Sequence, residues 1–342
     1  MTLFNKSRKI ICITMILTLI FSLNACSVKI KDDGKLNIVT TLFPQYDFAR
    51  QIVGDKGTVE ILLSPGIEAH SYDPTPADII KINESDLFIY TGENMEVWAA
   101  DIINSLENEV NILNVSEGIE LIKSEDEHSH EEVSEEENHN EESHEDNHTE
   151  DTHIEELGED EHSHNHVYDP HIWTSPVIAK QMVNNILEEI VKEDPENEAY
   201  YRENAEKYIE QLDELDSEFR TLADEADIKT IYFADKFAMY YFVEEYGFSY
   251  VSAYDSCSAE TEPSAKLVAQ MVDEVKENEV KAIYYAELSN HKAADTISKE
   301  TNADKLLLHS CHNVSKDEFN KGVTYVSLMK QNLENLKVGL YK

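Results

Sequence analysis

The chain has 342 residues, of which 29% are charged, and a formal net charge of −42. An acidic surface of this size repels phosphates, because binding to nucleic acid or to anionic lipid requires a basic face. Nucleic acid is therefore excluded as a natural partner, and cations are the ligands that the charge attracts. The length exceeds what one compact core usually holds, so we expect two lobes.

Residues 1–25 have the layout of a secretory signal peptide. Three basic residues precede an apolar run at 10–23 that is too short to be a convincing membrane span. The run ends in Leu23-Asn24-Ala25-Cys26, which resembles a bacterial lipobox, in which the cysteine becomes the first mature residue and carries lipid. We therefore expect lipidation of Cys26, a lipid-anchored tether at 26–35, and a place on the extracytoplasmic face of the cell membrane. An ordinary signal peptide with a chance cysteine is the alternative.

Cys257 and Cys311 are the pair of cysteines that remains after Cys12 is removed with the signal and Cys26 carries lipid. An even pair outside the cytosol is most simply a disulfide. Both cysteines lie beside candidate site segments, so a thiolate metal ligand is the alternative. Sequence cannot supply the Cα separation that decides between them.

Strands and helices alternate in the first part of the chain. Compact apolar runs predict strands at residues 36–41, 58–63 and 87–90. A helix is predicted from Pro44 to Val53, and another begins near Pro76, where Thr75 is a suitable N-cap. This order is typical of parallel βα units, so we expect residues 36–175 to form an N-terminal α/β lobe.

Residues 124–167 interrupt that lobe with a His-rich, acidic insertion. Within 125–166 the sequence interleaves nine histidines with nineteen carboxylates and contains no Lys or Arg. Imidazole favours zinc, copper, nickel or iron, so this composition predicts a weak, multivalent collector of transition metal. The insertion has almost no apolar residues to bury, and we expect it to be disordered when empty. A solvated acidic tether with incidental histidines is the alternative.

Residues 176–227 are predicted to form a helical linker that contains a long spine helix. Apolar residues at 201–222 recur in steps of three and four, which predicts one buried stripe along a helix of about thirty residues. That length exceeds one lobe, so we expect the helix to connect two. Residues 228–342 then form a C-terminal α/β lobe. Its strands are predicted at residues 230–234, 249–254, 282–285 and 305–308.

Three histidines lie in segments where a parallel α/β lobe binds ligands, at the carboxyl ends of strands. His70 lies in the loop at 64–74, and His312 follows the last predicted strand. His171 lies in the box Tyr168-Asp169-Pro170-His171-Ile172-Trp173, next to the insertion. These positions make the three imidazoles candidate metal ligands.

The same segments carry a resemblance to a known family. The loop around His70, the box around His171, Glu262-Pro263-Ser264-Ala265, Ala294-Asp295-Thr296-Ile297 and Asn332-Leu333-Glu334-Asn335-Leu336 resemble the cluster A-I (zinc/manganese) substrate-binding proteins of ABC transporters. The resemblance runs from about Leu36 to the C-terminus. It implies two α/β lobes with central, mostly parallel sheets, a long rigid helix that joins them, and a metal ion in the cleft between. A His-rich insertion before the box is typical of the zinc-specific branch.

The resemblance also implies a ligand set. His70 and His171 match the two ligands of the N-terminal lobe, although Ala69 replaces the usual proline before the first. His312 takes the place of the family's carboxylate after the last strand. Three imidazoles with at most one carboxylate suit tetrahedral zinc, whereas manganese sites are richer in oxygen.

The remaining ligand position falls on Lys236. An ammonium group is a poor metal ligand at neutral pH. We favour the neighbouring Asp235 as the ligand, with a water molecule beside a displaced Lys236, or the thiolate of Cys257, as alternatives.

The chain is therefore expected to be a monomeric, lipid-anchored receptor that captures Zn²⁺ and delivers it to the membrane permease of an ABC importer, which works with an ATPase. A manganese or iron receptor of the same fold is the nearest alternative. A zinc-dependent hydrolase belongs to another class, but the sequence has no His-Glu-x-x-His helix and no Gly-x-Ser-x-Gly elbow, so no enzyme is expected. An extracellular metal buffer or adhesin is a third alternative.

Overall fold

The computed structural model describes residues 34–69, 72–107, 109–123, 168–254 and 263–342. Asn37–Lys342 forms one compact unit. Cys26, His70, Cys257 and the His-rich insertion lie outside the described residues, so what the sequence predicts for them stays a prediction.

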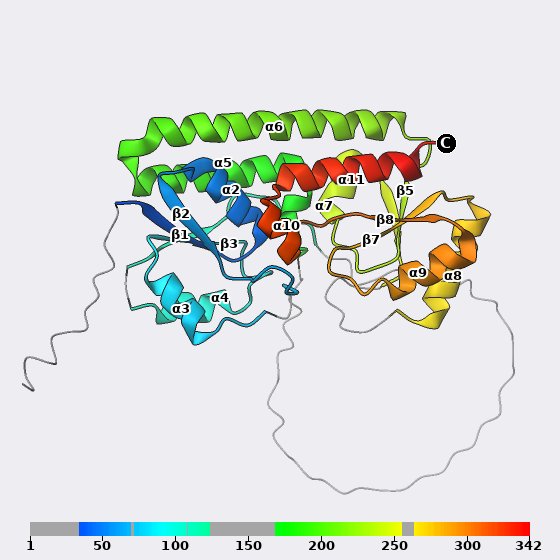
Figure 1. The fold of residues 1–342 in the computed structure, drawn as a ribbon, viewed down its shortest axis with the longest axis horizontal. Coiled ribbons are helices and arrows are strands. Elements are labelled where there is room, and N and C mark those ends of the chain that lie inside the picture. The colour runs from blue at the N-terminus through cyan, green and yellow to red at the C-terminus, as the bar shows by residue number, and fades with distance from the viewer. Residues whose placement is uncertain (1–33, 70–71, 108, 124–167, 255–262) are drawn as a thin grey trace, which may run out of the picture. The chain divides into compact units, whose positions relative to one another are not determined.

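The first sheet has four strands in the order β2-β1-β3-β4 (Figure 1). The strands are β1 Leu36–Thr40, β2 Gly57–Ile61, β3 Leu87–Tyr90 and β4 Asn111–Asn114. β3 pairs in parallel with both β1 and β4, and it is buried along its whole length, as expected for a central parallel strand. The first three strands are predicted correctly, whereas the half-polar β4 is missed. The helices beside this sheet are α2 Phe43–Val53, α3 Pro76–Asn83 and α4 Ala99–Ser105.

The start of α3 follows from its sequence. The Thr75 side chain accepts a hydrogen bond from the Asp78 backbone nitrogen at 3.3 Å, and the Asp78 carboxylate accepts one from the Thr75 nitrogen at 3.0 Å. This reciprocal pair is a capping box, and Pro76 occupies the first turn, where its missing N–H costs nothing. The predicted N-cap is confirmed.

The second sheet has the order β6-β5-β7-β8, and its three strand pairs are all parallel. Its strands are β5 Thr230–Phe233, β6 Ser249–Ser252, β7 Ala282–Tyr285 and β8 Asp304–Leu307. All four are predicted to within a few residues. The helices of this part are α7 Tyr240–Tyr246, α8 Ala265–Glu277, α9 Lys292–Thr301, α10 Lys316–Lys321 and α11 Tyr325–Leu340.

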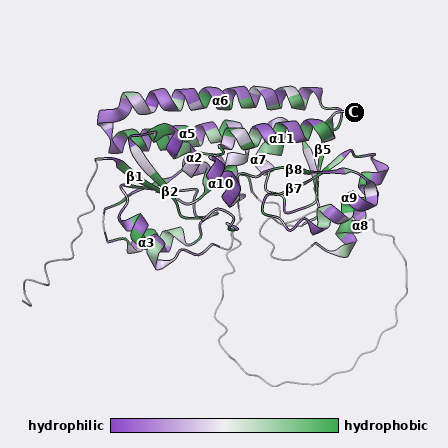
Figure 2. Ribbon diagram, in the orientation of Figure 1, coloured by the Kyte–Doolittle hydropathy of each residue, from purple (hydrophilic) through white to green (hydrophobic). Residues whose placement is uncertain are grey.

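Two long helices, α5 Pro176–Glu193 and α6 Glu198–Glu225, lie between the two sheets in the sequence. The short 3-10 helices η1 Ile172–Thr174 and η2 Pro195–Asn197 precede them. The buried side chains of α6 are those of the predicted stripe: Tyr201, Ala205, Tyr208, Leu212, Leu215, Phe219 and Leu222. Figure 2 shows hydrophilic residues between them along the helix. Because α6 packs against α2 and α5 and also against α7 and α11, it joins the two lobes as predicted.

One buried carboxylate fastens α2 to α6 and α11. The Asp47 side chain is fully buried and accepts hydrogen bonds from the Tyr208 hydroxyl at 2.8 Å and the Tyr325 backbone nitrogen at 2.7 Å. Arg50, one turn further along α2, supplies the compensating charge at 2.7 Å. A buried carboxylate is stable only with such partners, so this contact fixes the first turn of α11 against α2.

The predicted fold class is confirmed: two α/β lobes with four-stranded sheets are joined by a long helix. The lobe boundaries at residues 175 and 227 stay a prediction. Within the part of the chain that the structure describes, no helix has the length and apolar character needed to cross a membrane.

Candidate metal site

The candidate side chains lie in loops that follow strands of the two sheets. Glu68 follows β2, Asp235 follows β5, Glu287 follows β7 and His312 follows β8. His171 lies immediately before η1. The carboxyl ends of parallel strands are where open α/β sheets bind ligands, so the predicted and the newly found residues share this location.

His171 is held in one orientation by Asp169. The ring is fully buried, and its Nδ1 lies 3.2 and 3.3 Å from the two carboxylate oxygens of Asp169. An ionised carboxylate only accepts hydrogen bonds, so the proton of the neutral ring lies on Nδ1 and Nε2 is the nitrogen able to bind a cation. The Asp169 carbonyl in turn accepts from the Tyr241 hydroxyl at 2.8 Å. Asp169 thus fixes the tautomer of His171, and its carbonyl anchors the segment to α7.

His312 is oriented in the same way by Ser310 and Glu287. Its Nδ1 lies 2.7 Å from Ser310 Oγ and 3.2 Å from Glu287 Oε1. The Ser310 hydroxyl donates to Glu287 at 2.6 Å, so it accepts from the imidazole Nδ1–H. Nε2 is again the unprotonated nitrogen of the neutral ring, and Glu68 Oε1 lies 3.8 Å from it.

Electrostatics support the pairing of Glu287 with the imidazoles. Burial opposes ionisation of Glu287, but the charges of His309 and His312 and hydrogen bonds from His312 and Ser310 hold the pKa of this carboxyl well below its ordinary value. For His312, burial disfavours the charged ring, but the hydrogen bond and charge of Glu287 raise its pKa above the ordinary value. Both directions agree that Glu287 is a carboxylate, and a carboxylate behind an imidazole increases the ring's basicity toward a metal.

Asp235 lies at the end of β5 and is buried. Its Oδ1 accepts from the Lys236 backbone nitrogen at 2.8 Å, whereas Oδ2 is buried and makes no hydrogen bond within the described residues. Burial raises the pKa of Asp235. A buried carboxylate oxygen of this kind is costly without a partner, and a bound cation would supply one. The prediction that Asp235, and not Lys236, is the metal ligand is compatible with this arrangement and stays a prediction.

The segment of His312 is joined by one hydrogen bond to the His171 box and by another to the start of α2. The Trp173 indole nitrogen donates to the Ser310 carbonyl at 2.7 Å, and the Phe43 backbone nitrogen donates to the His312 carbonyl at 3.2 Å. The segment after β8 therefore lies against the β1–α2 turn and the His171 box. Asp235 makes its own backbone contact elsewhere, through Ser252 Oγ at 3.0 Å.

Within the described ranges, no three His, Cys, Asp or Glu side chains are close enough together to hold a metal ion. Since His70 lies outside those ranges, the four-ligand set of His70, His171, His312 and Asp235 is a prediction that the structure does not test. His309 is buried, and its Nδ1 accepts from the Cys311 backbone nitrogen at 2.9 Å, which ties the ring to its own loop.

Cys311 is a buried free thiol in the structure, with a left-handed backbone at φ 65°. Burial holds the pKa of this thiol well above its ordinary value, which makes it a weak nucleophile. Its predicted partner Cys257 lies outside the described residues, and the disulfide stays a prediction.

Glu287 and Ser310 are the contacts that the sequence interpretation missed. Glu287 is separated by one residue from the end of the predicted strand at 282–285. Because ligands bind at the carboxyl ends of parallel strands, its position alone could have marked it as a candidate. Ser310 lies two residues before His312, and nothing in its type marks it as an orienting group.

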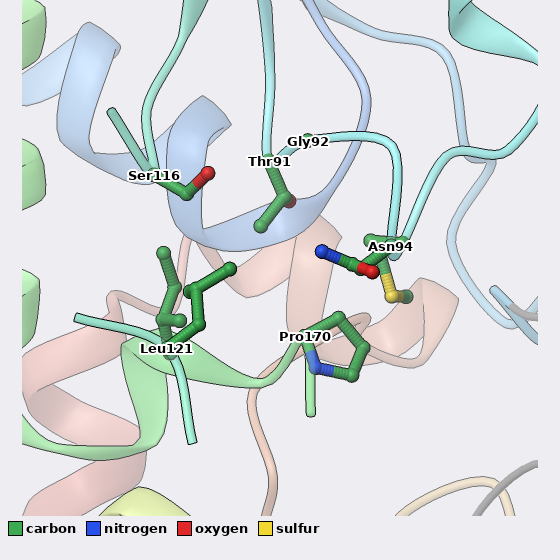
Figure 3. Close-up of a pocket in the computed structure, with 8 residues that line it drawn as sticks. Thr91, Gly92, Asn94, Ser116, Leu121 and Pro170 are labelled. Carbon is green, nitrogen blue, oxygen red and sulfur yellow. The ribbon is translucent and has the colours of Figure 1, made fainter. Parts of the chain in front are cut away.

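A small pocket lies next to the His171 box. Its lining comprises Thr91, Gly92, Asn94, Met95, Ser116, Leu121, Pro170 and Ile172. Figure 3 shows Asn94 and Pro170 close to each other at this pocket. Pro170 and Ile172 flank His171 in sequence, but none of the predicted ligands lines the pocket, so we do not assign it to metal binding.

Comparison with known proteins identifies the family of the chain. Residues 38–339 match the family described as ZnuA, zinc-uptake complex component A, periplasmic. The chain belongs to this family. The zinc-uptake component A family is the one that the resemblance predicts, and the match covers both sheets, α6 and all of the candidate loops.

Individual relatives agree with the family assignment. The high-affinity zinc uptake system protein ZnuA of Bacillus subtilis is 38% identical over 308 residues, which cover 90% of this chain and 88% of the relative. The zinc-binding lipoprotein AdcA of Streptococcus pneumoniae is 31% identical over 318 residues, 92% of this chain and 57% of the relative. The chain therefore spans little more than half of the length of AdcA.

Solved structures share the fold. The metal-dependent lipoprotein YcdH from Bacillus subtilis has a TM-score of 0.71 at 34% identity, with 90% of this chain and 100% of that chain covered. The Zn(II)-bound ZnuA-like domain of Streptococcus pneumoniae AdcA has a TM-score of 0.70 at 28% identity, with 90% and 100% covered.

Proposed function

We propose that the chain captures Zn²⁺ outside the cytoplasm and delivers it to the permease of an ABC importer. The observation that carries the proposal is the pair of buried imidazoles, His171 and His312, each with its Nδ1 held by a carboxylate-linked hydrogen bond, as in rings that bind a metal through Nε2. The zinc-uptake family and relatives that are named for zinc support the same cargo. Zinc is the ligand that is carried, so we propose no catalytic residue.

The ligand set that we propose is His70, His171, His312 and Asp235. Three imidazoles and one carboxylate match the tetrahedral nitrogen and oxygen sites of zinc. Manganese prefers more oxygen ligands, so we place the manganese or iron receptor second. Any comparison must allow for the generally higher affinity of zinc in the divalent series.

A receptor explains the family match better than a hydrolase or a metal buffer does. The family is described as a component of an uptake complex, which requires release of zinc to a partner. We propose that Cys26 carries the lipid anchor, that the chain acts as a monomer, and that it lies on the extracytoplasmic face of the membrane. The description of the AdcA relative as a lipoprotein supports this location.

The His-rich insertion is proposed to be a weak collector next to the tight site. Many weak sites on a tether raise the local concentration of zinc without any single strong contact. Removing residues 125–166 is therefore expected to slow uptake when zinc is scarce but to leave the tight site intact.

The experiment that tests transport uses cells that lack their own high-affinity zinc uptake receptor and express this chain with its permease and ATPase. Growth and cell zinc content at limiting zinc are compared for the unchanged chain, His171→Ala and His312→Ala. The proposal expects rescue by the unchanged chain and loss of rescue in both variants at equal protein level. Equal rescue by all three proteins would reject these histidines as transport ligands.

A further inference from the structure

Asn313, the residue after His312, has a fully buried side chain with an unusual set of contacts. Its Nδ2 donates to two carbonyl oxygens, Ser64 O at 2.9 Å and Ile67 O at 2.7 Å. Its Oδ1 accepts from the Val314 backbone nitrogen at 2.8 Å. The amide oxygen and both amide hydrogens of Asn313 thus have hydrogen-bond partners, and both hydrogens are donated to carbonyls of the first lobe.

The loop that Asn313 holds follows β2 of the first sheet, whereas Asn313 itself follows β8 of the second. A third hydrogen bond joins the same two segments, from the Gly66 backbone nitrogen to Val314 O at 2.8 Å. Gly66 has φ 86°, a left-handed conformation that suits glycine, and this turn brings its N–H toward Val314. The two segments are therefore joined as one hydrogen-bonded unit.

Within residues 64–69 of this loop, the buried apolar side chain is the small Ala69. Ile67 is 47% exposed, and Glu68 beside it has 45% of its side chain exposed. Loops with few buried apolar contacts open at low free-energy cost unless hydrogen bonds restrain them. Among the described residues, the Asn313 amide donates two hydrogen bonds to the loop and Gly66 N–H donates one to Val314 O, so loss of the amide is expected to free the loop.

We propose that Asn313 is a positioning residue of the zinc site, which latches the loop that carries Glu68 to the segment of His312 and so slows zinc release. The inference rests on the proposed function, because it needs zinc to bind between these loops. The 3.8 Å distance from Glu68 Oε1 to His312 Nε2 shows how near the latched loop comes to a candidate ligand atom.

The latch is expected to act on release more than on capture. Zinc reaches the site by diffusion whether or not the latch is intact, whereas loss of the latch frees the segment next to Asn313 and lets His312 leave the ion more often. Differences in affinity among variants of one site reside mainly in the dissociation rate. Loss of groups that orient metal ligands typically weakens affinity about 10-fold to 100-fold, and we expect the Asn313 variants to fall in that range.

The test compares Asn313→Ala, Asn313→Asp and a matched control in the purified full-length chain. Asn313→Asp keeps the size and the acceptor for Val314 but loses both donors. Asn185→Ala is the control, because Asn185 Nδ2 also donates to two carbonyls, Val115 O and Glu117 O, each at 3.1 Å. Those contacts tie α5 to the segment after β4, and neither carbonyl belongs to a candidate ligand loop.

Zinc affinity is measured by competition with a chromophoric chelator, and zinc release is measured by rapid mixing with excess chelator. Thermal unfolding of the zinc-free proteins shows which variants are folded. The latch predicts release about 10-fold to 100-fold faster in both Asn313 variants, association within about 2-fold, and release unchanged in Asn185→Ala. Asn313→Asp provides the comparison if Asn313→Ala is not folded.

Two results would count against the inference, and they differ from failure of the proposed function. If folded Asn313→Ala or Asn313→Asp releases zinc at the rate of the unchanged chain, Asn313 has no positioning role. If Asn185→Ala accelerates release as much, the effect is one of general stability. If the unchanged chain binds no zinc tightly, the proposed function fails first.

Discussion

The indole nitrogen of Trp173 lies 2.7 Å from the carbonyl oxygen of Ser310. This hydrogen bond joins the His171 box to the segment of His312, although 137 residues separate the two partners. Tyr325 extends the connection, since its hydroxyl donates to the Trp173 carbonyl at 2.6 Å while its backbone nitrogen donates to Asp47. The two imidazoles that we assign to zinc are therefore supported by one buried network that also includes α2 and α11.

Trp173→Phe tests that connection, because it keeps an aromatic ring and removes only the N–H donor. The buried Ser310 carbonyl loses its partner, which costs about 1 to 3 kcal/mol of unfolding free energy. Zinc affinity is expected to fall about 10-fold, as for other groups that orient a ligand segment. Urea unfolding and chelator competition measure the two effects. Tyr201→Phe, which removes a hydroxyl that donates to Asp194 at 2.6 Å where α5 leads into α6, is the control and should leave zinc affinity unchanged.

Glu287→Gln tests the orientation of His312. Glutamine keeps the size of the side chain but loses the charge that pairs with the imidazole, so zinc affinity should weaken about 10-fold to 100-fold. Chelator competition at constant pH gives the value. Glu214→Gln is the matched control, because Glu214 is exposed and pairs with the surface Lys330, and exposed pairs contribute about 0 to 1 kcal/mol. Equal affinities of Glu287→Gln and the control would show that Glu287 does not orient a zinc ligand.

Asp47→Ala tests the contact that fixes α11. The variant leaves the Tyr208 hydroxyl, the Tyr325 nitrogen and the Arg50 charge without their buried acceptor. We expect a loss of about 3 kcal/mol or more in unfolding free energy, which urea denaturation measures. Asp213→Ala, which removes the exposed partner of Lys180, should change stability by less than about 1 kcal/mol. Similar stabilities of the two variants would contradict the role given to Asp47.

Glu96 predicts a pH dependence of stability. Its buried carboxyl accepts from Thr41 Oγ1 at 2.5 Å and from the Gly92 nitrogen at 3.1 Å. Burial outweighs these hydrogen bonds and raises the pKa of Glu96 from 4.5 to about 7. The folded chain therefore keeps a proton that the unfolded chain loses, so stability from this group is full below pH 4.5 and is lost as pH rises to about 7.

Glu96→Gln cannot titrate, and the comparison with it isolates this effect. The unchanged chain should lose about 3 kcal/mol relative to the variant as pH rises through this window, because each pKa unit corresponds to about 1.4 kcal/mol. Urea unfolding of both zinc-free proteins at several pH values gives the difference. A constant difference across the window would show that the pKa of Glu96 is not raised.

Much of the fold follows from local patterns in the sequence. The stripe from Tyr201 to Leu222 predicts the buried face of α6 because helical periodicity is a local property. β4 is missed because only two apolar residues lie between Asn111 and Asn114, too few for a strand signal. Its strand conformation comes from its pairing with β3. Long-range pairing of this kind has no local signal.

The candidate site is predictable only in part, for the same reason. His171 and His312 can be proposed from the sequence because imidazole is a recognisable ligand type, and Asp169 lies two residues from the ring that it orients. The roles of Glu287 and Asn313 depend on partners that lie 25 and 246 or more residues away in the sequence. Only the folded arrangement of the two lobes brings those partners together.

The measurement that tests the central claim most directly is the stoichiometry and affinity of zinc binding, by competition with a chromophoric chelator. It compares the full-length chain with a version that lacks residues 125–166, and each of these with its His171→Ala and His312→Ala variants. Our account predicts one tight site that survives the deletion, weakens by about 100-fold or more in each histidine variant, and is accompanied by weaker sites only when the insertion is present. Loss of all zinc binding on deletion, with no effect of the two histidine variants, would contradict the cleft site and favour a His-rich metal buffer.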